Sequence, residues 1–233
     1  MSHPVLELQA AQTMADQLAH RRQNLPERDQ LQAARNELIR WDQARTLAHQ
    51  RLDQLETQIE QSEAESHEID QQIAKLEAQM KTVIAPREAE ALQHQIATLN
   101  ERRGGLDDAE LSALEEQSRL EVELTGLLGQ ESTLRAALLS ADSALSLAEA
   151  DIDGELANIA GRLDGLRAQV DPGVLKRYDR LRQHFVVAAA ALSGSRCEGC
   201  HLDLSAHEVD DVKDAIAADG VGECPQCGRI LLR

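Results

Sequence analysis

Aromatic side chains are nearly absent from this 233-residue sequence, of which they make up 1%. The three aromatic residues are Trp41, Tyr178 and Phe185. Broad globular cores take much of their buried area from such side chains, so a single thick core is excluded for most of the chain. The other apolar residues are mainly leucine and alanine, mixed with glutamine, glutamate and arginine, which is typical of long amphipathic helices. We therefore expect an elongated, mainly α fold.

Glycine is missing from residues 1–103, where proline occurs only at Pro4, Pro26 and Pro86. Nothing else in this stretch would interrupt a helix. Pro26 either kinks a long helix or begins a new one with Asn24 as its cap.

Two rows of mostly apolar residues recur at alternating spacings of three and four residues. The first row runs from Leu31 to Val83, and the second from Leu92 to Ile159. A seven-residue repeat of this length is typical of a left-handed coiled coil. The phase of the repeat breaks between Val83 and Leu92.

This phase break predicts a hairpin tip near residues 84–88, around Pro86. By contrast, Gly104 and Gly105 leave the second row in phase, so we interpret this pair as a soft spot within a helix. The sequence therefore predicts an antiparallel coiled-coil hairpin over residues 1–170, with arms of nearly equal length. A coiled coil between two copies is the alternative, but the short link makes pairing within one chain cheaper in entropy.

Positive charge is scarce, and the net charge is -17. From residue 171 onward there are eight basic and ten acidic side chains, which leaves 16 basic against 31 acidic ones in residues 1–170. Such arms should repel nucleic acid, so any anion site must be local. No apolar run approaches the ~18 residues of a membrane helix, and the first ten residues do not resemble a secretory leader. We expect a cytoplasmic protein without membrane contact.

All four cysteines lie in the last 37 residues, as the two Cys-x-x-Cys pairs Cys197, Cys200 and Cys224, Cys227. Two such pairs predict one Zn²⁺ in a tetrahedron of four thiolates, which leaves no open position for catalysis. Iron in the same tetrahedron and a redox dithiol are the alternatives, but the surroundings lack the βαβ context of redox motifs. His201 or His207 could replace a cysteine, although four thiolates already complete the shell.

Residues 171–233 read as a separate zinc ribbon domain with a short leading helix. Asp171-Pro172-Gly173 predicts the end of the second arm. We expect a helix at about Val174–Gln183, a strand at Phe185–Ala188, and a helix at Ser205–Ala217. Ser205 and Glu208 would form its capping box.

The chain resembles a bacterial family with a coiled-coil hairpin and a C-terminal zinc ribbon of the four-cysteine type. The resemblance covers nearly the whole chain, and its most specific part is Cys224-Pro225-x-Cys227-Gly228-Arg229-Ile230-Leu231. Further matching positions are Arg87-Glu88, Leu92, Leu106-Asp107-Asp108, Tyr178 and Cys197-x-Gly199-Cys200. The chain departs from the family at Leu232, where an aromatic residue is common. The resemblance implies a nucleic-acid-binding or scaffold protein.

A local group of basic residues favours contact with nucleic acid, and RNA in particular, through the ribbon end. Its members, accompanied by His184, are Lys176, Arg177, Arg180, Arg182, Arg196, Arg229 and Arg233. An ordinary solvated face is an equal interpretation of this group. The rival hypothesis is a protein adaptor that binds its partner along the hairpin, where polar residues such as Arg45 and Arg103 interrupt the apolar rows. Neither a phosphate loop nor a catalytic arrangement is present, so we expect no enzyme activity and no small-molecule substrate.

Overall fold

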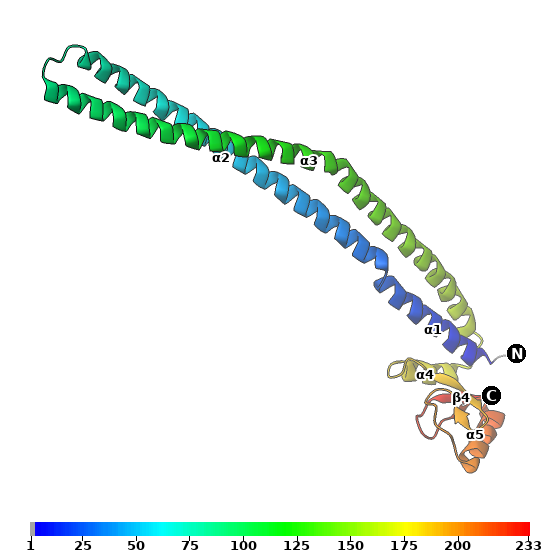
Figure 1. Ribbon diagram of the computed structural model, residues 1–233. Coiled ribbons are helices and arrows are strands. Elements are labelled where there is room, and N and C mark those ends of the chain that lie inside the picture. Colours follow the sequence, from blue (N-terminus) through cyan, green and yellow to red (C-terminus); the bar gives the residue numbers. More distant parts are fainter. Residues whose placement is uncertain (1–2) are drawn as a thin grey trace. The chain divides into compact units, whose positions relative to one another are not determined.

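A computed structural model describes residues 3–233 (Figure 1). Its helices are α1 (Pro4–Gln23), α2 (Pro26–Met80), α3 (Pro86–Arg167), α4 (Pro172–Arg182) and α5 (Ala206–Asp219). Its strands are β1 (Ala189–Ser193), β2 (Arg196–Cys197), β3 (Gly222–Glu223) and β4 (Ile230–Leu232). The predicted fold class, a mainly α hairpin followed by a small ribbon, is confirmed. Within residues 3–233, no helix has the length and apolar character needed to cross a membrane.

The chain forms two compact units. One unit, here called the ribbon unit, combines the described residues up to Gln30 with Asp142–Arg233. The other, here called the hairpin unit, is Leu31–Ala141. The predicted boundary at residues 170 and 171 falls between α3 and α4, whereas the compact units divide α2 and α3 themselves.

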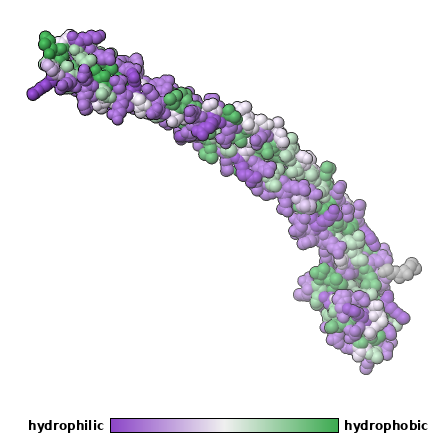
Figure 2. All heavy atoms as spheres, in the orientation of Figure 1, coloured by the Kyte–Doolittle hydropathy of each residue, from purple (hydrophilic) through white to green (hydrophobic). Residues whose placement is uncertain are grey.

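The hairpin unit is held together by the two predicted apolar rows. The buried residues of α2 in this unit all belong to the first row: Leu31, Trp41, Ala48, Leu55, Ser62, Ile69 and Ile73. The indole N–H of Trp41 donates to the Leu127 carbonyl oxygen of α3 at 2.7 Å, and Arg51 pairs with Glu116 across the two helices at 2.8 Å. Hydrophilic residues cover most of the face shown in Figure 2. The rows therefore pair within one chain.

The turn of the hairpin occupies residues 81–85, because α2 ends at Met80 and α3 begins at Pro86. Gly104 and Gly105 lie inside α3 and do not interrupt it. Arg103, a polar member of the second row, pairs with Asp70 of α2 at 2.7 Å.

Pro26 begins a new helix, which settles the alternative that the sequence left open. Asn24 does not cap the start of α2, however. It is the C-cap of α1, where its side-chain amide donates to the His20 carbonyl oxygen at 2.8 Å. The Asn24 amide N–H thus serves a carbonyl oxygen at the end of α1, whereas a cap of α2 would have used the side-chain oxygen as an acceptor.

The core of the ribbon unit joins both ends of the chain. Val5, Leu8 and Ala11 of α1 pack with buried residues that follow residue 165: Leu166, Val170, Tyr178, Ala188, Ala189, Ile230 and Leu232. The Gln9 side chain accepts from the Ala188 backbone N–H at 2.7 Å and donates to the Val186 carbonyl oxygen at 3.2 Å. α1 is thereby tied to the start of the sheet.

The sheet has the order β2-β1-β4-β3, with β1 and β4 parallel and both outer pairs antiparallel. The strand predicted at Phe185–Ala188 was wrong, since β1 begins at Ala189. Side chains occupy the backbone of the earlier segment: Arg182 and Gln9 bond the Val186 carbonyl oxygen, and Arg229 bonds that of Val187. Those oxygens are unavailable to a neighbouring strand.

Helix starts in the ribbon unit follow from capping side chains. Asp171 caps α4 by accepting from the Gly173 N–H at 2.8 Å, so α4 begins at Pro172. The residues that were predicted to end the second arm therefore also begin the next helix. The capping box of Ser205 and Glu208 is confirmed for α5.

Candidate metal centre

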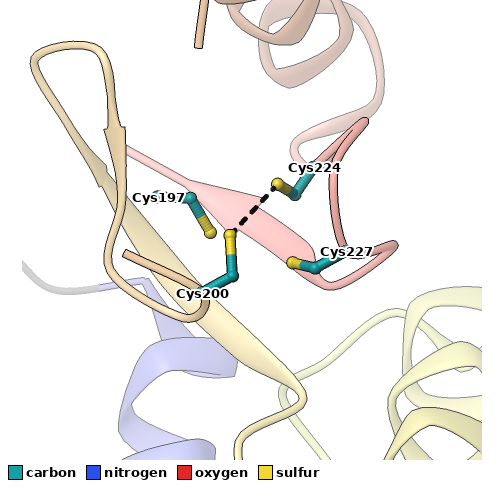
Figure 3. Close-up of side chains that lie close together, drawn as sticks. All are labelled: Cys197, Cys200, Cys224 and Cys227. Atoms are coloured by element: carbon teal, nitrogen blue, oxygen red, sulfur yellow. Dashed lines mark hydrogen bonds between the residues drawn. The ribbon is translucent and has the colours of Figure 1, made fainter. Parts of the chain in front are cut away.

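The four cysteine thiols meet at one point of the ribbon, as Figure 3 shows. Cys197 ends β2 and Cys224 follows β3, while Cys200 and Cys227 lie in the turns that come after them. Their Sγ atoms all lie within 4.8 Å of one another, and those of Cys200 and Cys224 are 3.9 Å apart. Zinc bonds thiolate sulfur at about 2.3 Å, which sets sulfurs about 3.8 Å apart in a tetrahedron. The arrangement fits one zinc ion.

Each cysteine pair is shaped by a tight backbone turn. The His201 N–H donates to the Cys197 carbonyl oxygen at 2.7 Å, and the Gly228 N–H donates to that of Cys224 at 2.8 Å. His201 and Gly228 both have positive φ, 61° and 74°. They occupy the same position, directly after the second cysteine of each pair. His201 is thus a turn residue of the first Cys-x-x-Cys pair. It adopts there the positive-φ conformation that Gly228 adopts in the second pair.

Neither histidine belongs to the described cluster of candidate metal ligands. His207 is exposed on α5, where its Nδ1 lies 3.1 Å from an Asp211 carboxylate oxygen. A hydrogen bond between the imidazole and the backbone of the same residue is the main cause that raises the pKa of His207, and the Asp211 carboxylate raises it further. The ligand set in the structure is therefore the predicted set of four thiols.

The thiols of this cluster differ in acidity. Burial raises the pKa of Cys224 to about 12 and also raises that of Cys197. Burial acts on Cys227 in the same direction, but hydrogen bonds from the backbone and side chain of Arg229 outweigh it and lower its pKa to about 7. Buried thiolates without a cation are costly, so a divalent ion is what allows all four to ionise together.

Comparison with known proteins agrees with this geometry. Residues 8–185 match the family described as "CT398-like coiled coil hairpin domain". The chain belongs to this family. Residues 196–231 match a second description, "C4-type zinc ribbon domain". With the clustered cysteines, this makes the cofactor of the CT398-like chain one structural Zn²⁺.

Relatives of the CT398-like chain occur in several bacteria. A protein of Mycobacterium tuberculosis is 36% identical over 142 residues, which are 61% of this chain and 58% of that protein. The chain thus spans less than two thirds of that relative's length. A protein of Mycobacterium leprae is 24% identical over 230 residues, covering 92% of this chain and 93% of the relative.

Two solved structures share the fold. CT398 from Chlamydia trachomatis superposes with a TM-score of 0.80 at 21% identity, covering 98% of this chain and 95% of that one. A protein from Mycobacterium smegmatis superposes with a TM-score of 0.78 at 25% identity, covering 99% and 96%.

The basic residues proposed for nucleic-acid contact do not form one patch. Arg177 pairs with Glu223, Arg182 pairs with Asp16, and Arg229 donates to the Val187 carbonyl oxygen at 2.7 Å. The Arg229 guanidinium also lies 4.3 Å from the centre of the Phe185 ring. These three arginines therefore have structural partners inside the ribbon unit.

The other four predicted residues are exposed: Lys176, Arg180, Arg196 and Arg233. Lys176 and Arg180 share one face of α4 and border a hollow of about 490 Å³ with Asp179 and Gln183. Within residues 3–233 neither Lys176 nor Arg180 has an ion-pair partner within 4.0 Å. Lys176 and Arg180 thus combine proximity with free charge.

Sequence reasoning missed Gln9, which is 6% exposed and bonds a segment about 180 residues away. No local pattern marks it, because glutamine is frequent throughout the arms. A polar residue between Leu8 and Ala11 on the buried face of α1 was the only available signal.

Proposed function

We propose that this protein is a non-enzymatic adaptor whose hairpin unit binds a protein partner. The observation that carries the proposal is the apolar surface of this unit. Eight of the twelve large apolar side chains that are exposed within residues 3–233 belong to it: Ile39, Leu47, Ile84, Leu111, Leu114, Val122, Leu128 and Leu139. Burial of these side chains against another protein would remove apolar area from water, which is favourable.

The metal centre supports a role without catalysis. Four thiolates close the zinc shell, so no position is open to a substrate or an activated water. The ion then contributes stability to a unit whose small sheet has little core of its own.

Nucleic-acid binding is a second candidate, favoured by one observation. Lys176 and Arg180 are exposed on the same face of α4, with Gln183 beside them. Two charges make few phosphate contacts, and Trp41 and Tyr178 are buried, which removes them as stacking platforms. We therefore place this function second to the adaptor.

Affinity purification with and without nuclease tests both functions. An adaptor retains its protein partners after nuclease treatment and at moderate salt, since apolar contacts depend little on salt. A nucleic-acid-bound protein loses them. The absence of any nuclease-resistant partner would refute the adaptor.

A charge reversal at Lys176 and Arg180 tests the second candidate directly. If these residues hold phosphates, Lys176→Glu with Arg180→Glu weakens retention on single-stranded RNA at ~50 mM salt, where such contacts are strongest. Arg119→Glu, at an exposed position of α3, is the matched control and should have no effect. Equal retention of all three proteins would rule out this face.

A further inference from the structure

The closed end of the hairpin leaves its apolar rows partly uncovered. Ile69 and Ile73 of α2 are 3% and 8% exposed. Between Ile73 and Ala113 the apolar members of both rows are only half-buried, as most members of the second row also are after Ala113. The half-buried residues between Ile73 and Ala113 are Leu76, Met80, Val83, Leu92, Ile96, Leu99 and Leu106.

Apolar side chains are accordingly visible on the surface around the turn between α2 and α3 in Figure 2. Ile84, within this turn, is 97% exposed. An isoleucine in water at the tip of a turn contributes nothing to folding, but it can be buried by a partner.

A groove of about 550 Å³ runs between the two helices at this end. One wall is Gln72, Lys75, Leu76 and Gln79 of α2, and the other is His94, Gln95, Thr98 and Leu99 of α3. Leu76 and Leu99 are half-buried, whereas the other six residues are exposed. The groove thus has an apolar floor of two leucines and a polar rim rich in amides. Two helical walls around such a floor have the form that accepts a third helix.

The charge of this end differs from that of the rest of the hairpin unit. Residues 72–99 contain three basic and three acidic side chains, whereas residues 31–71 and 100–141 each contain four basic and nine acidic ones. Among the described residues that line the groove, there is no carboxylate, and the ionisable ones are Lys75 and His94. Acidic segments are repelled along the arms but not here.

We propose that this groove binds an amphipathic helix of a partner protein. Apolar side chains one turn apart on that helix pack on Leu76 and Leu99, and the residues that flank them are acidic or uncharged. The inference rests on the proposed adaptor function and assigns it a location and a partner chemistry.

The first experiment measures peptide binding to the full-length, zinc-loaded protein. The probe is a fluorescein-labelled peptide of roughly 18 residues, long enough to form a helix when bound. It carries leucines at spacings of three and four and glutamates on both flanks. Its matched partner has lysines in place of the glutamates. Fluorescence anisotropy should show saturable binding of the glutamate peptide, about tenfold tighter than that of the lysine peptide.

Three variants locate the binding. Leu99→Asp should weaken the glutamate peptide by about tenfold or more. Lys75→Glu leaves the two leucines of the floor intact. It should weaken the binding of the glutamate peptide and strengthen that of the lysine peptide. Ala137→Asp, at an exposed position of α3 away from the groove, should change neither.

Several results would overturn the inference. Binding that Leu99→Asp and Lys75→Glu both leave intact would place the peptide elsewhere, and no saturable binding would exclude the groove. Dimers of the unmodified protein that Leu99→Asp abolishes, measured by sedimentation, would make a second copy the occupant. Displacement of the peptide by single-stranded RNA would assign the groove to nucleic acid.

Affinity purification separates failure of this inference from failure of the adaptor. If Leu99→Asp and Lys75→Glu both retain the same nuclease-resistant partners as the unmodified protein, the adaptor function stands and the groove is not its binding site. If the unmodified protein retains none, the adaptor itself fails.

Discussion

The ribbon unit and the hairpin unit exclude water from apolar side chains in different ways. In the ribbon unit, residues from α1, from β4 and from the segment just before β1 are completely buried, including Val5, Leu8, Ala188 and Ile230 at 0% exposed. In the hairpin unit, the buried residues of α2 all lie in the first apolar row. They number one or two in every seven residues, such as Leu31, Trp41, Ala48 and Leu55. The first arrangement forms a core whose parts depend on one another. The second forms an extended surface that tolerates local change.

The largest expected effect breaks the ribbon unit alone. Cys224→Ser, or treatment with a chelator, should remove the zinc and unfold the sheet. The expected loss in the free energy of unfolding of the ribbon unit is on the order of several kcal/mol. Most of the helical circular dichroism should persist, because α2 and α3 contain 55 and 82 residues. Elemental analysis should give one zinc per unmodified chain and none after the substitution.

His207→Ala is the control for this prediction, and it should keep its zinc. Substoichiometric metal in freshly purified reduced protein, or a reversible disulfide in its place, would contradict the zinc assignment.

A smaller effect tests whether α1 belongs to the core of the ribbon unit. Gln9→Ala removes the acceptor of the buried Ala188 N–H, whereas the Val186 oxygen keeps its bond from Arg182. We expect a loss of about 2–3 kcal/mol in the free energy of unfolding of this unit. Gln17→Ala, on the exposed face of α1, should change it by less than ~0.5 kcal/mol. Denaturant unfolding followed by segment-resolved hydrogen exchange distinguishes the two units.

A comparable test of the hairpin unit should have a weaker and more local result. Trp41→Phe removes the indole donor to the Leu127 carbonyl oxygen and part of a ring that is 5% exposed. We expect a loss of about 1–2 kcal/mol, with faster hydrogen exchange near residues 41 and 127 and unchanged zinc content. Leu47→Ala, 65% exposed, serves as the control. Simultaneous loss of zinc would show that the two units are not independent.

The smallest effect concerns the start of α5. Hydrogen bonds from the Ser205 backbone, then from its side chain, lower the pKa of the Glu208 carboxyl. A lowered pKa in the folded state means that this group stabilises the fold above its ordinary pKa near 4.5 and loses that effect as the pH falls through the folded value. The difference in melting temperature between the unmodified protein and Glu208→Gln should therefore shrink from pH 7 toward pH 3. A difference that grows on acidification would contradict the capping role.

The sequence predicted those features that local patterns encode. The apolar row that begins at Leu31 follows a seven-residue repeat, and the four cysteines have the spacing of metal ligands. The sequence alone therefore predicts both features. The strand at Phe185–Ala188 was misassigned because its carbonyl oxygens bond side chains from α1, α4 and the last turn, none of which periodicity can foresee. The ion pairs of Arg177 with Glu223 and of Arg182 with Asp16 could not be predicted for a similar reason, because their partners lie in distant parts of the chain.

The core of the ribbon unit also sets an order of biosynthesis. Gln9 emerges from the ribosome some 180 residues before Ala188, the backbone group that it bonds. At a synthesis rate of about 5–20 residues per second, α1 waits for about 10–35 s with its apolar face uncovered. The hairpin unit is made entirely within this interval and has only local pairings to complete. Cys224, Cys227 and β4, the strand between β1 and β3 in the sheet, are made only after this interval, so zinc capture follows the synthesis of the hairpin unit.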